Sequence, residues 1–219
     1  CWADVGYQRP DLVIVEFSVN DGGQPENEII ASMEGIVRQL RERTPSKPEI
    51  LFLYTMTNAQ LEEFKNGHLP VPTQCHEKVA AHYGIPGVAM SRYAADQILA
   101  GKLTPEEFAK DGVHPTDKGY ALYLESLIPF FEKAAAVSFE KKPLPKPLAE
   151  RPLTDAKLIS YDWSELDSGW LGWQISPVAK IPHLAVSDKP ASTITLKFKG
   201  AQAGIYSIIG PDTGNIDYS

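Results

Sequence analysis

Two patterns of apolar and polar positions divide this chain. Up to about residue 135, unbroken apolar runs alternate with stretches whose apolar residues recur every three to four positions. The unbroken runs are rich in β-branched residues and predict strands buried on both faces, at 11–19, 49–56 and 85–90. The helical spacing predicts helices at 27–43, 72–83, 91–101, 104–112 and 117–135. Strands that alternate with helices predict an α/β fold, in which a parallel sheet packs between two helix layers.

Local signals add detail to this α/β pattern. Thr104 and Glu107, with proline at the first helical position between them, have the spacing of a capping box. Glu34 and Arg38 predict an i,i+4 ion pair on the outer face of the helix over 27–43. A doubly wound sheet usually has more than three strands, so we expect further strands upstream of residue 1.

Beyond residue 138 the helical spacing disappears. The segment 139–153 contains "KKPLPKPLAERPL", a proline-rich composition typical of a stiff, extended linker. From 154 to 219, short runs with strand-type alternation are separated by Gly and Pro turns. We therefore expect an α/β domain at 1–138, a linker at 139–153 and an incomplete all-β sandwich at 154–219.

Composition and charge exclude two classes of function. The chain has 219 residues, of which 43% are hydrophobic and 22% are charged, as in a soluble globular protein. Its formal net charge of -7 argues against nucleic-acid binding, which needs a basic face. No apolar run approaches the roughly 20 residues of a membrane-spanning helix, so no membrane partner is expected. The pattern gives no indication of oligomeric state.

A metal site is the less favoured interpretation of the cluster "CHEKVAAH". Cys75 and His82 share one face of the predicted helix, whereas His76 lies on another. The chain has two cysteines, Cys1 and Cys75, which leave a disulfide open but do not form a disulfide framework. We therefore expect no metal.

Polar residues follow the first predicted strand in "SVNDGG". Ligands of open parallel sheets bind beyond the carboxyl ends of the strands. The side-chain amide of Asn20 could donate a hydrogen bond into that crevice, as an oxyanion hole does. The alternative is an Asx-turn, in which Asn20 or Asp21 bonds nearby backbone, and on this feature alone the turn is the simpler explanation.

The segment "DGVHPTDKGY" brings an acid and a histidine together outside a helix. A histidine that acts as a general base needs a carboxylate on its other ring nitrogen, and Asp111 can supply one to His114. Pro115 keeps His114 in an extended conformation. A capping and turn role for both residues explains the segment equally well when it is taken alone.

Together, "PDLVIVEFSVND" and "GKLTPEEFAKDGVHPTDKGYALYLESL" resemble the SGNH hydrolases, also called the GDSL family of lipases and acylhydrolases. The resemblance covers about residues 1–135 and rests on the Asn20-Asp21 pair and the Asp111-x-x-His114 block. It implies a flavodoxin-like three-layer sandwich that hydrolyses esters through a serine, with no cofactor. It also implies catalytic roles for His114 as the base, Asp111 as its orienting acid and Asn20 as an oxyanion donor.

One part of the family pattern is missing from this chain. The family's serine and a second oxyanion donor, a glycine, precede the Asn-Asp block. Residues 1–19 contain one serine, Ser18, inside the first predicted strand, and Ser91 is explained by a helix N-cap. We therefore expect the nucleophile upstream of Cys1 and no activity from this chain alone.

Three tryptophans in "YDWSELDSGWLGW" suggest a role for the β-domain. Trp163, Trp170 and Trp173 could stack on sugars, although tryptophans of a small sandwich more often belong to its core. The sequence therefore predicts an ester hydrolase that removes small acyl groups, such as acetyl groups on carbohydrate. One alternative is an inactive protein that binds glycans through the β-domain, and another is a β-domain that only packs on the catalytic domain. An accessory β-domain suggests a secreted or periplasmic protein.

Overall fold

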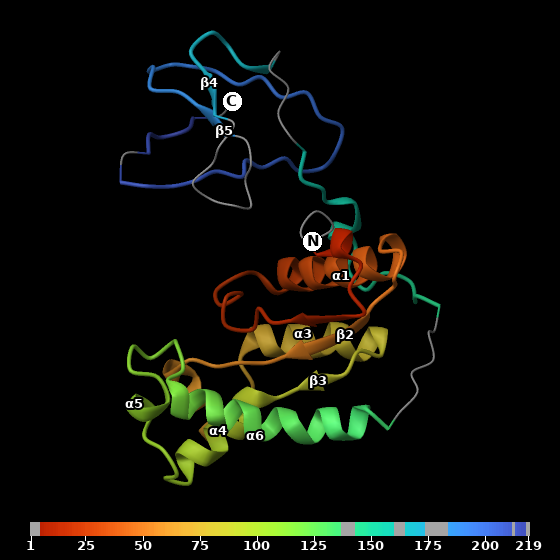
Figure 1. Ribbon diagram of the computed structural model, residues 1–219, viewed down its shortest axis with the longest axis vertical. Coiled ribbons are helices and arrows are strands. Elements are labelled where there is room, and N and C mark those ends of the chain that lie inside the picture. Colours follow the sequence, from red (N-terminus) through yellow and green to blue (C-terminus); the bar gives the residue numbers. More distant parts are fainter. Residues whose placement is uncertain (1–4, 137–142, 160–164, 174–183, 212, 218–219) are drawn as a thin grey trace. The chain divides into compact units, whose positions relative to one another are not determined.

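Three parallel strands form the centre of the α/β unit in the computed structural model (Figure 1). The structure describes residues 5–136, 143–159, 165–173, 184–211 and 213–217. They fall into two units, Cys1–Leu158 and Ile159–Ser219. The helices and strands of the first unit are η1 (Gly6–Gln8), β1 (Leu12–Val15), α1 (Glu26–Arg43), β2 (Glu49–Leu53), η2 (Asn58–Gln60), α2 (Leu61–Lys65), α3 (Val71–Tyr83), β3 (Gly87–Val88), α4 (Met90–Leu99), α5 (Pro105–Phe108), α6 (Asp117–Ala134) and η3 (Leu153–Asp155).

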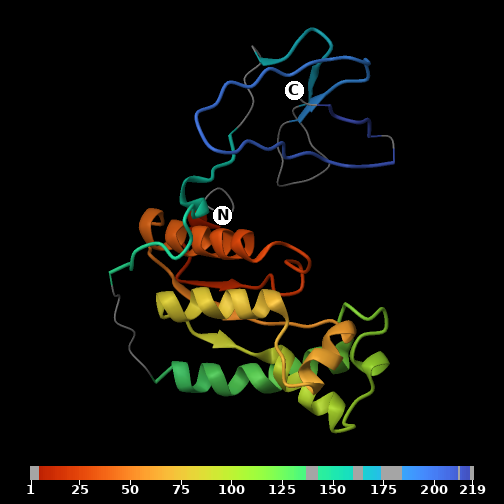
Figure 2. The same ribbon diagram turned by 180° about the vertical axis from the view of Figure 1, so that it is seen from behind.

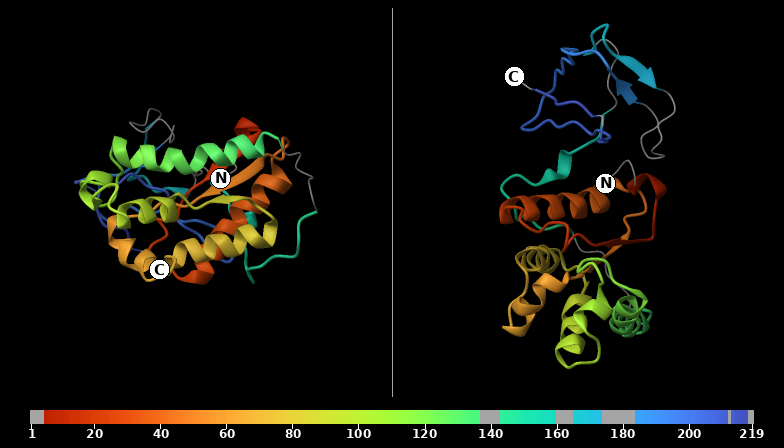
Figure 3. Two further views of the ribbon diagram at one scale, coloured as in Figure 1. Left: turned by 90° about the horizontal axis from the view of Figure 1, so that it is seen from below. Right: turned by 90° about the vertical axis from the view of Figure 1, so that its left-hand side faces the viewer.

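The sheet has the order β1-β2-β3, and helices cover it in two layers. Helices α1 and α3 lie on one side, and α4 and α6 lie on the other (Figure 3). Alternation along β2 explains this, because Ile50 and Phe52 join the core under α1 and α3, whereas Leu51 joins the core under α4 and α6. The parallel sheet between helix layers confirms the predicted α/β class.

The first strand is covered on one face rather than on both. Val13 and Val15 are buried, but Leu12 and Ile14 are 43% and 48% exposed. Among the described residues, β1 pairs with β2 alone, so its other edge is open. Exposed apolar side chains also follow one side of α6, at Tyr120, Leu124, Ile128 and Phe131. The expectation of two covered faces is therefore wrong for the described residues.

Two local predictions are also corrected. Helix α4 begins at Met90 with Ala89 as its N-cap, so Ser91 lies in the first turn and is not the cap. Glu34 and Arg38 do not form a surface pair, because Glu34 is fully buried and Arg38 pairs with Glu42 at 2.8 Å. The capping box at the start of α5 is confirmed, with both of its hydrogen bonds present.

Residues 143–158, most of them in the predicted linker, pack on α1 within the first unit. Both oxygens of buried Glu34 accept backbone hydrogen bonds, from Leu148 at 2.6 Å and Ala149 at 2.7 Å. The hydroxyl of Tyr83 donates to the same carboxylate, and burial followed by this hydrogen bond raises the pKa of Tyr83 to about 12. Gly35 permits the close approach, since a Cβ there would lie 2.9 Å from the carbonyl oxygen of Leu153.

The second unit contains one antiparallel strand pair among its described residues. Strand β4 (Leu171–Trp173) pairs with β5 (Leu184–Val186), and Leu166 forms an isolated bridge with Ile194. The predicted β-sandwich remains a prediction. Figure 2 gives the view of both units from behind.

Across the described residues, no helix is both long and apolar enough to cross a bilayer.

Candidate active site

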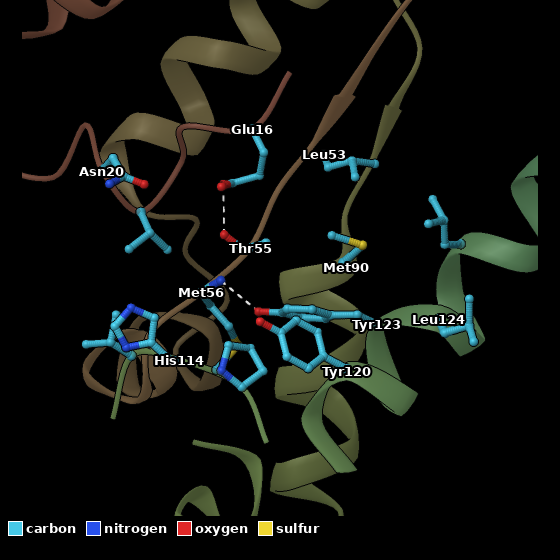
Figure 4. Close-up of a pocket in the computed structure, with 14 residues that line it drawn as sticks. Glu16, Asn20, Leu53, Thr55, Met56, Met90, His114, Tyr120, Tyr123 and Leu124 are labelled. Atoms are coloured by element: carbon cyan, nitrogen blue, oxygen red, sulfur yellow. Dashed lines mark hydrogen bonds between the residues drawn. The ribbon is translucent and has the colours of Figure 1, made fainter. Parts of the chain in front are cut away.

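A cavity of about 510 Å³ lies where the loops after β1 and β2 meet the start of α6 (Figure 4). Polar side chains from distant parts of the chain line it together with an apolar wall. The lining residues are Glu16, Val19, Asn20, Leu53, Thr55, Met56, Met90, Val113, His114, Pro115, Tyr120, Tyr123, Leu124 and Leu127. Asn20 and His114 are 94 residues apart in the sequence, and both line this cavity.

Asn20 sits in a tight turn of the loop that follows β1. The turn closes through backbone hydrogen bonds, from the N–H of Asp21 to the Phe17 carbonyl at 2.9 Å and from the N–H of Gly22 to the Val19 carbonyl at 3.2 Å. Gly23 has a φ of 82°, a conformation that favours glycine. Because these turn bonds come from the backbone, the Asn20 side chain is free to line the cavity.

His114 and Asp111 form a pair within one short loop. The Nδ1 atom of His114 lies 2.7 Å from Oδ2 of Asp111. The other carboxylate oxygen accepts the backbone N–H groups of His114 at 2.8 Å and Val113 at 2.9 Å. The hydrogen bond from the His114 ring, and then those two N–H groups, hold the pKa of Asp111 well below its ordinary value. A charged acceptor on Nδ1 fixes the proton there and leaves Nε2 to act as a base.

The loop that carries His114 is anchored to the loop after β2. The backbone N–H of Asn58 donates to the Gly112 carbonyl at 2.8 Å, and its side-chain amide donates to the Ala109 carbonyl at 3.0 Å. The His114 side chain itself is 82% exposed. The sequence prediction missed Asn58, whose position directly after the second predicted strand was the signal that could have identified it.

A hydrogen-bonded cluster of Glu16, Ser18 and Thr55 forms the floor between β1 and β2. Oε1 of Glu16 accepts from the Ser18 hydroxyl at 2.7 Å, the Ser18 backbone N–H at 3.0 Å and the Thr55 hydroxyl at 2.8 Å. Ser18 is fully buried, and its oxygen also accepts the Thr55 N–H at 2.9 Å. Ser91 is fully buried as well, and no serine lines the described cavity.

The cysteine and histidines of "CHEKVAAH" have separate surroundings. Cys75 is a buried free thiol, and burial raises its pKa. His76 pairs with Asp21, while Nε2 of His82 lies 2.8 Å from the Lys146 carbonyl. Within the described ranges, no group of three or more potential metal ligands converges.

The predicted sugar-stacking surface of three tryptophans is only partly within the described residues. Trp163 lies outside the described residues, and Trp173 ends β4. The indole N–H of Trp170 donates to the Thr193 carbonyl at 2.9 Å, a structural contact within the second unit. Sugar stacking therefore remains a prediction.

Comparison with known proteins places these features in a family. The model of the GDSL-like lipase/acylhydrolase family matches residues 1–122, which confirms the resemblance seen in the sequence. No curated protein matches the chain.

Two solved structures are similar to the chain, and both are described as a two-domain esterase active on acetylated mannans. One, co-crystallized with mannopentaose, is 30% identical with a TM-score of 0.56, and the match covers 68% of this chain and 37% of that one. The other is 28% identical with a TM-score of 0.61, and the match covers 78% of this chain and 43% of that one. The chain thus spans less than half the length of each.

Proposed function

The chain belongs to the GDSL-like lipase/acylhydrolase family, and from that premise we propose that it is the larger part of the catalytic domain of an ester hydrolase. The observation that supports this most directly is that Asn20 and the His114-Asp111 pair meet at one cavity. A base held by a carboxylate, and an amide donor at the same cavity, are what acyl transfer to a serine requires.

In the proposed reaction, Nε2 of His114 takes the proton from a serine hydroxyl as that oxygen attacks the ester carbonyl. The carboxylate of Asp111, ionised because its pKa is low, stabilises the imidazolium that forms. The Asn20 amide donates to the oxyanion of the tetrahedral intermediate, an interaction of about 3 kcal/mol in the transition state. His114 then protonates the leaving alcohol, and water releases the acyl group by the same steps in reverse.

The serine itself is proposed to come from residues upstream of Cys1, together with the second oxyanion donor. Ser18 and Ser91 are buried and hydrogen-bonded or enclosed within the fold, so neither can serve. The open edge of β1 supports this proposal, because a further strand would pair with it. The exposed side chains of Leu12 and Ile14 also leave room for further residues on that face of β1. We call the chain joined to its own upstream residues the extended protein.

Acetylated carbohydrate is the proposed substrate class. The similar solved structures are esterases active on acetylated mannans, and the cavity has room for an acyl group beside its apolar wall of Leu53, Met90 and Leu124. No cofactor or metal has a part in the proposed chemistry. We further propose that residues beyond 158 belong to an accessory β-domain, and that the protein acts outside the cytoplasm.

The test compares hydrolysis of p-nitrophenyl acetate by this chain and by the extended protein. We expect activity from the extended protein and none above a denatured control from the chain alone. In the extended protein, His114→Ala should lower kcat by several orders of magnitude, as loss of a triad base does. His68→Ala, which changes an exposed loop histidine, is the control. Near-normal kcat in His114→Ala would reject the proposed role.

A further inference from the structure

A second histidine-aspartate pair lies directly behind the Asn20 turn. Nε2 of His76, on α3, is 2.7 Å from Oδ2 of Asp21, the residue that follows Asn20. The His76 side chain is 1% exposed and the Asp21 side chain is 25% exposed. The pair therefore joins a buried side chain of α3 to the loop that carries Asn20, the proposed oxyanion donor.

The surroundings of His76 fix its ring. The ring centroid lies 6.4 Å from those of Phe52 and Tyr54, at the end of β2 and just beyond it, with the Phe52 ring edge-on. A ring enclosed in this way holds its Nε2 at one place, and the hydrogen bond satisfies a buried polar group that would otherwise lose its partner. His76 thus presents a fixed anchor to the Asp21 carboxylate.

The part of the turn that follows Asn20 is held by few other contacts. It contains two adjacent glycines, Gly22 and Gly23, which are the residues with the greatest backbone freedom. Its backbone hydrogen bonds, from the N–H groups of Asp21, Gly22 and Gln24, are local to residues 17–24. Ser18, at the start of the turn, bonds the backbone of Thr55. After Asn20, the bond from Asp21 to His76 is the side-chain contact that ties the turn to another element of the fold.

We propose that His76 is a positioning residue, which holds Asp21 and thereby fixes the Asn20 amide at the cavity. The proposal rests on the proposed function, because positioning matters only if Asn20 stabilises an oxyanion. A donor that drifts by about 1 Å from the oxyanion can cost about 100-fold in rate. His76, from the "CHEKVAAH" segment, would then serve the active site without touching the substrate.

The first experiment measures the tether in this chain, without catalysis. Amide hydrogen exchange is followed at residues 19–24 in the wild type, His76→Ala, Asp21→Ala and His82→Ala. His82 is the matched control, since it lies on the same helix but bonds the Lys146 carbonyl at 2.8 Å. We expect exchange at the hydrogen-bonded amides of Gly22 and Gln24 to rise about tenfold or more in both tether variants and to stay unchanged in His82→Ala. Asp21→Ala leaves α3 intact, so it decides the outcome if His76→Ala does not fold.

The second experiment measures the consequence in the extended protein. His76→Ala and Asp21→Ala should each lower kcat about 10- to 100-fold with KM changed less than about twofold, because the donor acts in the transition state. The affinity for a phenylboronic acid, which forms a tetrahedral anion on the serine, should fall by a similar factor, while inhibition by acetate should not change. The double variant should be no worse than either single variant.

The outcomes separate this proposal from the proposed function. Unchanged exchange in both tether variants would overturn the anchoring role. Increased exchange with kcat equal to that of His82→Ala would overturn the catalytic consequence. An inactive wild-type extended protein, or an active His114→Ala variant, would instead reject the proposed function, and the exchange result would still decide the tether.

Discussion

Asp111 links the ionisation of the proposed site to the stability of its loop. The carboxylate accepts one ring N–H and two backbone N–H groups, all within 2.9 Å, and these bonds, led by the one from His114, lower its pKa. The pKa of an aspartate carboxyl in the unfolded chain is about 3.9. As the pH falls toward this value and below it, the unfolded state binds more protons than the folded state. The stabilisation from Asp111 is therefore complete above about pH 5 and is lost as pH falls through the lowered pKa.

We accordingly expect the difference in unfolding free energy between the wild type and Asp111→Asn to shrink as pH falls below about 4. Urea titrations of this chain at several pH values measure it. Asp117→Asn, at the exposed first turn of α6, serves as the control. A difference that stays constant down to about pH 2 would contradict the assigned hydrogen bonds.

Glu16 is expected to be a structural acceptor of the site floor. One of its oxygens receives three hydrogen bonds, from two groups of Ser18 and from Thr55. Glu16→Ala leaves these donors without an acceptor and should lower the unfolding free energy of this chain by about 1–3 kcal/mol. Glu16→Gln keeps an amide oxygen in the same place and should lower it by less. Equal losses for the two variants in urea titrations would argue against this role.

At the residue scale, the sequence predicted those site residues whose partners are close by in the chain. Asp111 and His114 are three residues apart, and Asn20 follows a recognisable strand. His76 and Glu16 were not predicted as parts of the site, because their partners Asp21 and Thr55 lie 55 and 39 residues away. Periodicity shows that a residue is buried or exposed, but not which distant group it meets.

At the scale of elements, the two long helices were predicted more closely than the strands, whereas the helix predicted at 104–112 is only Pro105–Phe108. The prediction of a helix over 27–43 compares with α1 at Glu26–Arg43, and that over 117–135 with α6 at Asp117–Ala134. The strand predicted over 11–19 ends instead at Val15, since a strand extends only as far as its neighbour pairs with it. A helix closes its hydrogen bonds within its own sequence, so caps and prolines reveal its ends.

The segment after residue 142 shows how a buried acceptor can change the role of a proline-rich stretch. Glu34 is fully buried, with the N–H groups of Leu148 and Ala149 and the Tyr83 hydroxyl on its carboxylate. Glu34→Gln replaces one acceptor oxygen by an NH₂ group that faces a donor. We expect a loss of about 1–3 kcal/mol in unfolding free energy and faster proteolysis within 143–158.

The exposed ion pair on the same helix provides the control for that variant. Glu42 accepts from Arg38 at 2.8 Å but is partly open to solvent, so Glu42→Gln should cost about 0.5 kcal/mol or less. If Glu34→Gln were no more destabilising than Glu42→Gln in urea titrations, the buried anchor would be refuted.

At the scale of the whole molecule, these contacts make residues 143–158 part of the first unit. This unit ends at Leu158, whereas the α/β domain was predicted to end at residue 138. Residues 143–158 contribute Leu144 and Leu148 to the core beside α1. They also bring the Leu153 and Ala156 carbonyls within 3.1 Å of the Gln39 side-chain amide. Composition alone predicted an extended segment but not its docking, because docking depends on what α1 presents.

A comparison of two shortened chains tests where the unit ends. Residues 1–158 should unfold cooperatively, with the midpoint in urea that this unit has in the full chain. Residues 1–138 lose the buried bonds to Glu34 and Gln39 and expose apolar surface of α1, so their unfolding free energy should fall by at least about 3 kcal/mol. Adding residues 143–158 as a separate peptide should recover part of that loss by mass action. Equal stability of the two shortened chains would instead restore the predicted linker, and the Glu34 contacts would then carry no net stabilisation.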